Sequence, residues 1–194
     1  MSRLSREEFR AMNSLPRRLL QKHYELPRCK RMGVRFNEKD VLEIGCGSGY
    51  GADLILNDKP RSYVGVDMME EQKALARKRE IQGAEFRIED ATHMHTIEDT
   101  SKDLIVIFGV LHHVSEWQVV LLECHRVLRS GGEMYVEEPA GKLLELFDGR
   151  WRHWDHPKVG RSTLHTLESS GYPPLLALVS TEHNGNKKKY FHTR

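Results

Sequence analysis

The feature that most constrains the fold is the stretch VLEIGCGSGYG at residues 41–51, in which an apolar run ends in four alternating glycines. The run 41–44 has the length and composition of a buried strand. Glycines directly behind a strand let the backbone turn sharply and approach a ligand closely. The stretch therefore predicts an α/β domain that holds a nucleotide-like ligand at this turn.

Four further segments have the composition of strands, and helical patterns lie between most of them. They are residues 63–66, 84–88, 104–108 and 133–136. Alternation of this kind predicts βαβ units and a parallel sheet with helices on its faces.

The clearest helix is predicted at residues 115–128. Ser115 and Gln118 have the spacing of a capping box, apolar residues form one stripe, and Gly131 is placed to end the helix. We expect this helix to pack on the sheet through its stripe.

Two helical pieces are expected ahead of the first strand. Ser5 and Glu8 have the spacing of a capping box for a helix that ends at Pro16, and a second amphipathic stretch runs on to Pro27. We expect residues 1–39 to form an N-terminal helical segment that packs on the core or covers it.

The end of the chain resembles an antiparallel pair. A short helix is expected between residue 162 and Gly171, and strands at 175–180 and 188–192 flank the hairpin signal Asn184-Gly185. Residues 40–194 are therefore expected to form one three-layer α/β/α domain. Its seven-stranded sheet would be mostly parallel, with an antiparallel last strand.

Composition limits where in the cell the protein is expected to work. The chain has 39% hydrophobic residues and shows neither a membrane-spanning run nor the apolar core of a signal peptide. Its three cysteines are too few and too widely spaced for a disulfide framework. We expect a cytoplasmic protein without membrane attachment. The first forty residues hold eleven Lys/Arg and five Asp/Glu, so a nucleic-acid or protein substrate stays open beside a solvated helix face.

The glycine turn lacks the partners that phosphate binding requires. A P-loop needs a lysine and a serine or threonine behind its last glycine, where this chain has Ala52 and Asp53. The dinucleotide pattern GxGxxG would place its third glycine at Tyr50. Nucleoside triphosphates are therefore disfavoured, and the dinucleotide pattern fits poorly.

The stretch Glu-x-Gly-x-Gly-x-Gly at 43–49, followed by Asp67 at the end of the next strand, resembles the class I S-adenosylmethionine-dependent methyltransferases. The resemblance is to the small, stand-alone, seven-stranded Rossmann-like members and extends from Asp40 to the end of the chain. The segments EDA at 89–91, FGVLHHV at 108–114 and RVLRSGG at 126–132 are similar to later segments of that family.

The resemblance implies S-adenosyl-L-methionine as the cofactor. It implies that Glu43 helps to fix the ammonium group of the methionine tail, that Asp67 accepts hydrogen bonds from the ribose hydroxyls, and that Asp90 lies beside the adenine amino group. The full expected cofactor set is Glu43, Gly45, Cys46, Gly47, Gly49, Asp67, Met68, Asp90, Ala91 and Phe108.

Residues for catalysis and acceptor binding are expected elsewhere. His112 or His113 is a candidate general base, because imidazole titrates near neutral pH. The alternative is that both only form the wall of the pocket. The segment 141–160 is either a lid over the acceptor or an aromatic plug of the core. The expected acceptor-binding residues are Tyr24, His113, Trp151, His153 and Trp154. The spacing of the histidines predicts no metal site.

We therefore expect a methyltransferase that acts on a nucleophilic atom of a small molecule. Methyltransferases that act on exocyclic or amide nitrogens often have Asn/Asp-Pro-Pro-Tyr/Phe after the fourth strand, and this chain has Phe108-Gly109-Val110-Leu111 there. An RNA or protein methyltransferase is the alternative. Two further alternative functions are a nicotinamide-dependent oxidoreductase and a non-catalytic cofactor-binding subunit. The oligomeric state stays open.

Overall fold

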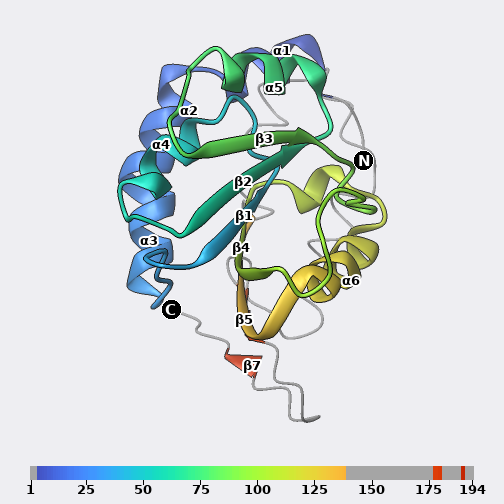
Figure 1. Ribbon diagram of the computed structural model, residues 1–194. Coiled ribbons are helices and arrows are strands. Elements are labelled where there is room, and N and C mark those ends of the chain that lie inside the picture. Colours follow the sequence, from blue (N-terminus) through green and yellow to red (C-terminus); the bar gives the residue numbers. More distant parts are fainter. Residues whose placement is uncertain (1–3, 139–176, 181–188, 191–194) are drawn as a thin grey trace.

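The computed structural model describes residues 4–138 and two later strand segments, 177–180 and 189–190 (Figure 1). The helices are α1 (Arg6–Met12), α2 (Leu15–Leu20), α3 (Leu26–Arg31), α4 (Tyr50–Leu56), α5 (Glu70–Arg77) and α6 (Trp117–Val127). A π-helical turn covers Gln21–Glu25, and a 3₁₀ turn covers Leu111–His113. The strands are β1 (Asp40–Ile44), β2 (Ser62–Asp67), β3 (Ala84–Ile88), β4 (Lys102–Phe108), β5 (Leu128–Glu137), β6 (Ala177–Ser180) and β7 (Lys189–Tyr190).

The strands form one sheet in the order β3-β2-β1-β4-β5-β6-β7. Neighbours from β3 to β5 pair in parallel, whereas β6 pairs antiparallel with β5 and β7 pairs antiparallel with β6. The predicted seven-stranded, mostly parallel Rossmann-like sheet is confirmed. The strand that runs against the others is β6 and not the last strand.

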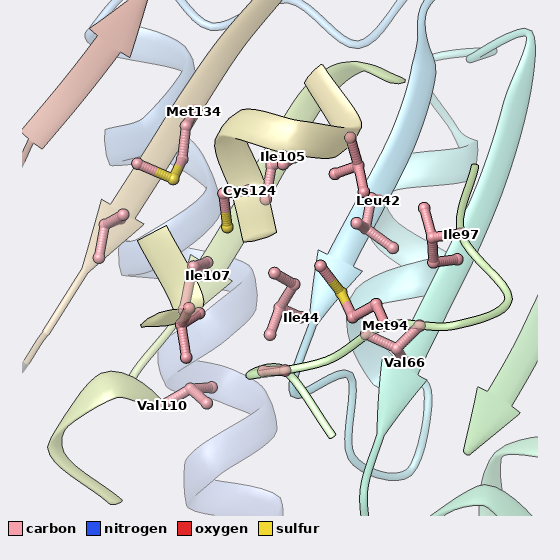
Figure 2. Close-up of a cluster of buried hydrophobic side chains, with 14 of the residues drawn as sticks. Leu42, Ile44, Val66, Met94, Ile97, Ile105, Ile107, Val110, Cys124 and Met134 are labelled. Carbon is pink, nitrogen blue, oxygen red and sulfur yellow. The ribbon is translucent and has the colours of Figure 1, made fainter. Parts of the chain in front are cut away.

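Alternate side chains of the strands build two separate cores. On one face, Leu42, Ile44, Ile105 and Ile107 pack with Cys124 of α6 (Figure 2). On the other face, Val41, Leu104 and Val106 of the same strands pack against helices α3, α4 and α5. These helices contribute Cys29, Ile55 and Ala76. Central parallel strands with apolar residues at successive positions are covered on both faces, so the domain has the expected three layers.

The N-terminal helices differ from the prediction in two respects, the first being that α1 ends at Met12 and Pro16 already lies in the first turn of α2. The capping box of Ser5 and Glu8 is present at the start of α1. The second helix does not close near Pro27: α2 runs through the π-helical turn directly into α3, which ends at Arg31. Pro27 lies in the first turn of α3, where the missing N–H group has no helical partner to lose.

Helix α6 also differs at both ends. Its N-cap is Glu116 and makes no side-chain capping bond, so the capping box expected from Ser115 and Gln118 was wrong. The helix ends at Val127 and continues straight into β5. Gly131 lies inside that strand with φ of +79°, where the register against β4 shifts. The predicted stripe is correct: Val120, Cys124 and Val127 are buried.

Three expectations fall outside the described residues. They are the helix between 162 and 171, the turn at 184–185, and the segment 141–160 with Trp151, His153 and Trp154. Within the described part of the chain, no helix has the length and apolar character needed to cross a membrane.

Candidate cofactor site

A cavity lies at the carboxyl ends of β1, β2 and β4. The strand order reverses between β1 and β4, which is where ligands of open α/β sheets bind. The lining residues come from the glycine turn, the ends of β2 and β4, and the N-terminal segment. They are Leu4, Met12, Arg17, Arg18, Gln21, Glu43, Gly45, Cys46, Gly47, Ser48, Tyr50, Asp67, Met68, Met69, Gln72, Phe108, Gly109, Val110 and His113.

The glycine turn is shaped by what surrounds each glycine. Gly45 has φ of +72°, and a Cβ atom there would overlap the side chain of Val110. Gly47 has φ of +52°, and a Cβ atom there would meet only the amide of Gln72, at an ordinary contact distance of 4.0 Å. A Cβ on Gly49 would lie 2.7 Å from the ring of Phe86. Gly49 therefore serves packing and does not line the cavity, while Gly47 leaves room for a ligand.

Asp67 stands directly opposite this turn. The backbone N–H of Gly47 donates to Asp67 Oδ2 at 3.0 Å, and the N–H of Met69 donates to Oδ1 at 2.8 Å. Burial raises the pKa of Asp67, and these two N–H donors oppose the rise. Each carboxylate oxygen keeps a further lone pair, so Asp67 can accept hydrogen bonds from ligand hydroxyls.

Glu43 is buried beneath the turn, with 2% of its surface exposed. The hydroxyl of Tyr63 donates to its carboxylate. Burial raises the pKa of Glu43 to about 7, although Tyr63 and the charge of Arg17 oppose the rise. A buried carboxylate without a bonded cation is suited to an ammonium group of a ligand.

The comparisons with known proteins agree with this geometry. A family model described as a methyltransferase domain matches residues 42–136, which include the glycine turn, Glu43 and Asp67. A probable S-adenosylmethionine-dependent methyltransferase of Mycolicibacterium smegmatis is 39% identical over 114 residues, covering 57% of this chain and 42% of that protein. The chain belongs to the S-adenosylmethionine-dependent methyltransferases.

Two other relatives cover more of the chain. A thiol S-methyltransferase of Rattus norvegicus is 27% identical over 184 residues, covering 89% of this chain and 73% of that protein. The crystal structure of an S-adenosylmethionine-dependent methyltransferase from Aquifex aeolicus has the same fold, with a TM-score of 0.62, 17% identity, and coverage of 71% of this chain and 74% of that one. The alignment with the Mycolicibacterium relative covers less than half of that relative's length.

The cofactor of this methyltransferase family is S-adenosylmethionine, and the cavity fits it. The lack of a side chain at Gly47 admits a ligand against the backbone. Glu43 offers a buried carboxylate to the ammonium group and Asp67 offers lone pairs to ribose hydroxyls. Phe108 and Met68 add apolar wall, and Cys46 lies between the two acids. Burial raises the pKa of the Cys46 thiol, so this thiol has little nucleophilic character.

Besides Gly49, two more expected cofactor residues, Asp90 and Ala91, are not among those that line the cavity. Asp90 accepts from the N–H of Thr92 at 2.9 Å and from its hydroxyl at 2.7 Å, which closes the turn after β3. Ala91 is 2% exposed and packs in the core under α6. Contacts of these two residues with adenine stay a prediction.

The N-terminal segment of the methyltransferase reaches the cavity through residues other than the expected one. Arg17, Arg18 and Gln21 line it, and Arg17 pairs with Glu25 at 2.7 Å. Tyr24 does not line the cavity; it is 41% exposed, and its hydroxyl accepts from Arg28 at 2.8 Å. The π-helical turn places Gln21 and Glu25 inward, so Tyr24 points outward.

The segment after β4 is held by a residue that the sequence analysis did not single out. The carboxylate of Glu138, which is 5% exposed, accepts from the backbone N–H groups of Val110 and Leu111 at 2.9 and 2.8 Å. It also bonds Nδ1 of His112 at 2.6 Å. His112 is buried and does not line the cavity, whereas His113 does, with its ring 3.9 Å from that of His112. Glu138 therefore fixes the turn that presents His113.

The sequence carried a signal for some of the residues that were missed. Glu138 directly follows β5, the neighbour of β4, so its position at the carboxyl edge could be read from the strand order. Arg17, Arg18 and Gln21 share a helical face, but their sequence does not indicate which part of the core that face meets. Among the described residues, no group of three or more His, Cys, Asp or Glu side chains is arranged to hold a metal ion.

Proposed function

We propose that this methyltransferase moves the methyl group of S-adenosylmethionine to a nucleophilic atom of a small-molecule acceptor. The observation that carries the proposal is the contact between Gly47 and Asp67 across a cavity that Glu43 also lines. These three residues are complementary to a ligand that has ribose hydroxyls and an ammonium group but no phosphate.

Bound S-adenosylmethionine supplies a methyl group that is already activated by a positively charged sulfur. Glu43 would pair with the ammonium group and Asp67 with the ribose, so the methionine tail and the ribose would each be held by a carboxylate. Holding an acceptor in line with the methyl group at ~3–3.5 Å contributes about 7–11 kcal/mol to lowering the barrier. Positioning is thus the main task of these residues.

His113 is the candidate to receive the proton that the acceptor loses. It lines the cavity directly after β4, and its turn is anchored by the carboxylate of Glu138. Glu138 also receives Nδ1–H of His112, which sets the orientation of the ring that lies against His113. A neutral imidazole beside the acceptor can take up the proton that the acceptor loses.

A small acceptor is supported by the closure of the cavity. Residues of α1 and α2 line the same space as the glycine turn, which leaves less room for a polymer. Several basic residues of this segment already have partners within the chain. Arg17 pairs with Glu25, Lys30 pairs with Asp58, and Arg28 donates a hydrogen bond to Tyr24. A relative that covers 89% of this chain is named as a thiol S-methyltransferase, so thiols come first among the acceptors to test.

Cofactor binding is tested by thermal unfolding with S-adenosylhomocysteine and with NAD. We expect S-adenosylhomocysteine to raise the midpoint and NAD to leave it unchanged. Asp67→Asn should lose most of this stabilisation. Asp99→Asn, a matched change on an acid whose side chain is 74% exposed, should keep it. Stabilisation by NAD alone would contradict the proposal.

Acceptor class is tested by transfer of labelled methyl groups to panels of thiols, phenols, amines, RNA and protein. The proposal expects product with a small molecule and little change with salt. Transfer to RNA alone, with a rate that falls steeply as salt rises, would replace the small-molecule acceptor. Cofactor binding without transfer to any panel would indicate a non-catalytic subunit.

A further inference from the structure

Gln72, on α5, is a buried side chain whose polar amide is not fully hydrogen-bonded. It is 2% exposed, and its Oε1 atom has no hydrogen-bond partner among the described residues. The other buried polar atoms of this kind are Nε atoms of Arg18, Arg28 and Arg79, whose side chains are only partly buried. Gln72 is therefore the neutral polar side chain that most needs a partner.

The amide of Gln72 lies at the wall of the cofactor cavity. Its three terminal atoms are 4.0 Å from the position that a Cβ of Gly47 would occupy. Gly47 is the residue whose N–H donates to Asp67. Gln72, Gly47 and Asp67 therefore surround one region of the cavity, which is the region where the proposed function places the ribose.

We propose that Gln72 accepts a hydrogen bond from one ribose hydroxyl of the cofactor, while Asp67 accepts from the other. The inference rests on the proposed function and adds a residue that selects for the intact ribose. Both oxygens of Asp67 already accept a backbone N–H, so a second acceptor lets each hydroxyl have its own. A hydroxyl both donates and accepts, so it satisfies the amide in either orientation.

This role predicts opposite effects on stability and on binding. Without a ligand, a buried amide without a partner destabilises the folded protein. Replacing it by an apolar side chain of similar size should therefore raise the unfolding midpoint of the free protein. The same change should weaken cofactor binding, because the ribose hydroxyl then loses its acceptor.

The test uses Gln72→Met, with Gln118→Met on the exposed face of α6 as the matched control. Binding of S-adenosylhomocysteine and of its 2′-deoxy and 3′-deoxy analogues is measured by calorimetry for each protein. We expect Gln72→Met to weaken S-adenosylhomocysteine binding about 5- to 100-fold and to raise the midpoint of the free protein. One deoxy analogue should bind the wild type more weakly by a similar factor, and Gln72→Met should bind that analogue and S-adenosylhomocysteine equally.

A lower midpoint together with wild-type discrimination between the ligands would show that Gln72 only packs, which overturns this inference alone. Wild-type protein that fails to bind S-adenosylhomocysteine would overturn the proposed function and this inference together. Gln118→Met should behave as the wild type in both measurements.

Discussion

The acidic residues at the amino ends of the strands, the amino edge of the sheet, differ in their partners from those at the carboxyl ends, the carboxyl edge. At the amino edge, Asp40 and Asp103 are bonded by Arg61 and Arg129. At the carboxyl edge, Glu43 is buried and Asp67 is partly buried, and neither forms an ion pair among the described residues. Asp40 and Glu43 belong to the same five-residue strand, so the difference is produced by the surroundings and not by the element.

The pKa values record this contrast. Burial opposes ionisation of Asp40, but hydrogen bonds from Ser62, Arg129 and Arg61 together outweigh it and lower the pKa to about 2. Burial raises the pKa of Glu43 to about 7, and the hydrogen bond from Tyr63 and the charge of Arg17 offset this rise only in part. Burial likewise raises the pKa of Glu137, at the end of β5, to about 7. The carboxylates of the amino edge are paired with arginines, whereas Glu43 and Asp67 at the carboxyl edge line the cavity without a cationic partner among the described residues.

The largest effect is expected from a change that disturbs only the carboxyl edge. Gly45→Ala combines positive φ with overlap of Val110, and should cost about 2–5 kcal/mol of unfolding free energy. Gly131→Ala is the matched change near the amino edge, where φ is +79° but nothing lies within 4 Å of the added carbon. It should cost about 1–2 kcal/mol. Denaturant titration of both variants measures the difference, and equal losses would contradict the steric argument.

Glu43→Gln should weaken S-adenosylhomocysteine binding roughly tenfold or more at pH 8, because a bond to a charged group is lost. In the wild type, affinity should fall as pH drops below about 7, by at most tenfold per pH unit, since the ammonium group favours ionised Glu43. The variant should lack this pH dependence, which calorimetry between pH 6 and 8 detects. The same slope in both proteins would assign it to another group.

The unfolding free energy of the protein without cofactor should change with pH in the opposite direction to the cofactor affinity. Between the unfolded pKa of 4.5 and the folded value of about 7, the folded protein holds the additional proton on Glu43, so its unfolding free energy falls as pH rises. Glu43→Gln should remove this fall. At pH 8 the free variant should therefore be at least as stable as the wild type. A clear loss of stability would contradict a ligand-binding role for this buried charge.

Asp40→Asn should have the opposite outcome at the other edge. We expect a loss of about 1–2 kcal/mol at pH 7 with unchanged cofactor binding. Because the pKa of Asp40 is lowered to about 2, its contribution is present above pH 3.8 and is lost as pH falls towards 2. Acid titration of the variant should lack that component. Weakened cofactor binding would show that the two edges are coupled.

The smallest effect is expected for Arg61→Ala. The side chain of Arg61 is 60% exposed, and Asp40 keeps Arg129 as a partner. Loss of an exposed ion pair of this kind costs less than about 1 kcal/mol and should shrink further in high salt. A larger, salt-independent loss, measured by thermal unfolding, would mean that this network is rigid.

Much of the fold could be predicted because the apolar runs that indicate strands in the sequence are the segments that the sheet buries. The predicted β3 agrees residue for residue, and the others differ at their ends. The errors lie where local signals compete with tertiary ones: Ser115 and Gln118 have capping spacing, yet α6 begins at Glu116 without that cap. Gly131 is a plausible helix end, yet the register shift of β5 uses its positive φ.

The candidate site divides in the same way. Glu43, Gly47 and Asp67 could be inferred because strand, turn and following strand are close in the sequence and their geometry is local. Gln72 and Arg17 could not, because their relation to the cavity depends on how α5 and α2 pack around it.

The amino-acid sequence by itself therefore determined the alternating architecture, the glycine turn and its paired acids, because each depends on periodicity and on backbone conformations that few residue types adopt. Only the tertiary structure decided which carboxylates ionise easily, which helix closes the cavity and which amide is left without a partner. Those properties arise from burial and from contacts between distant segments, and a carboxylate carries no sign of either in its own sequence position.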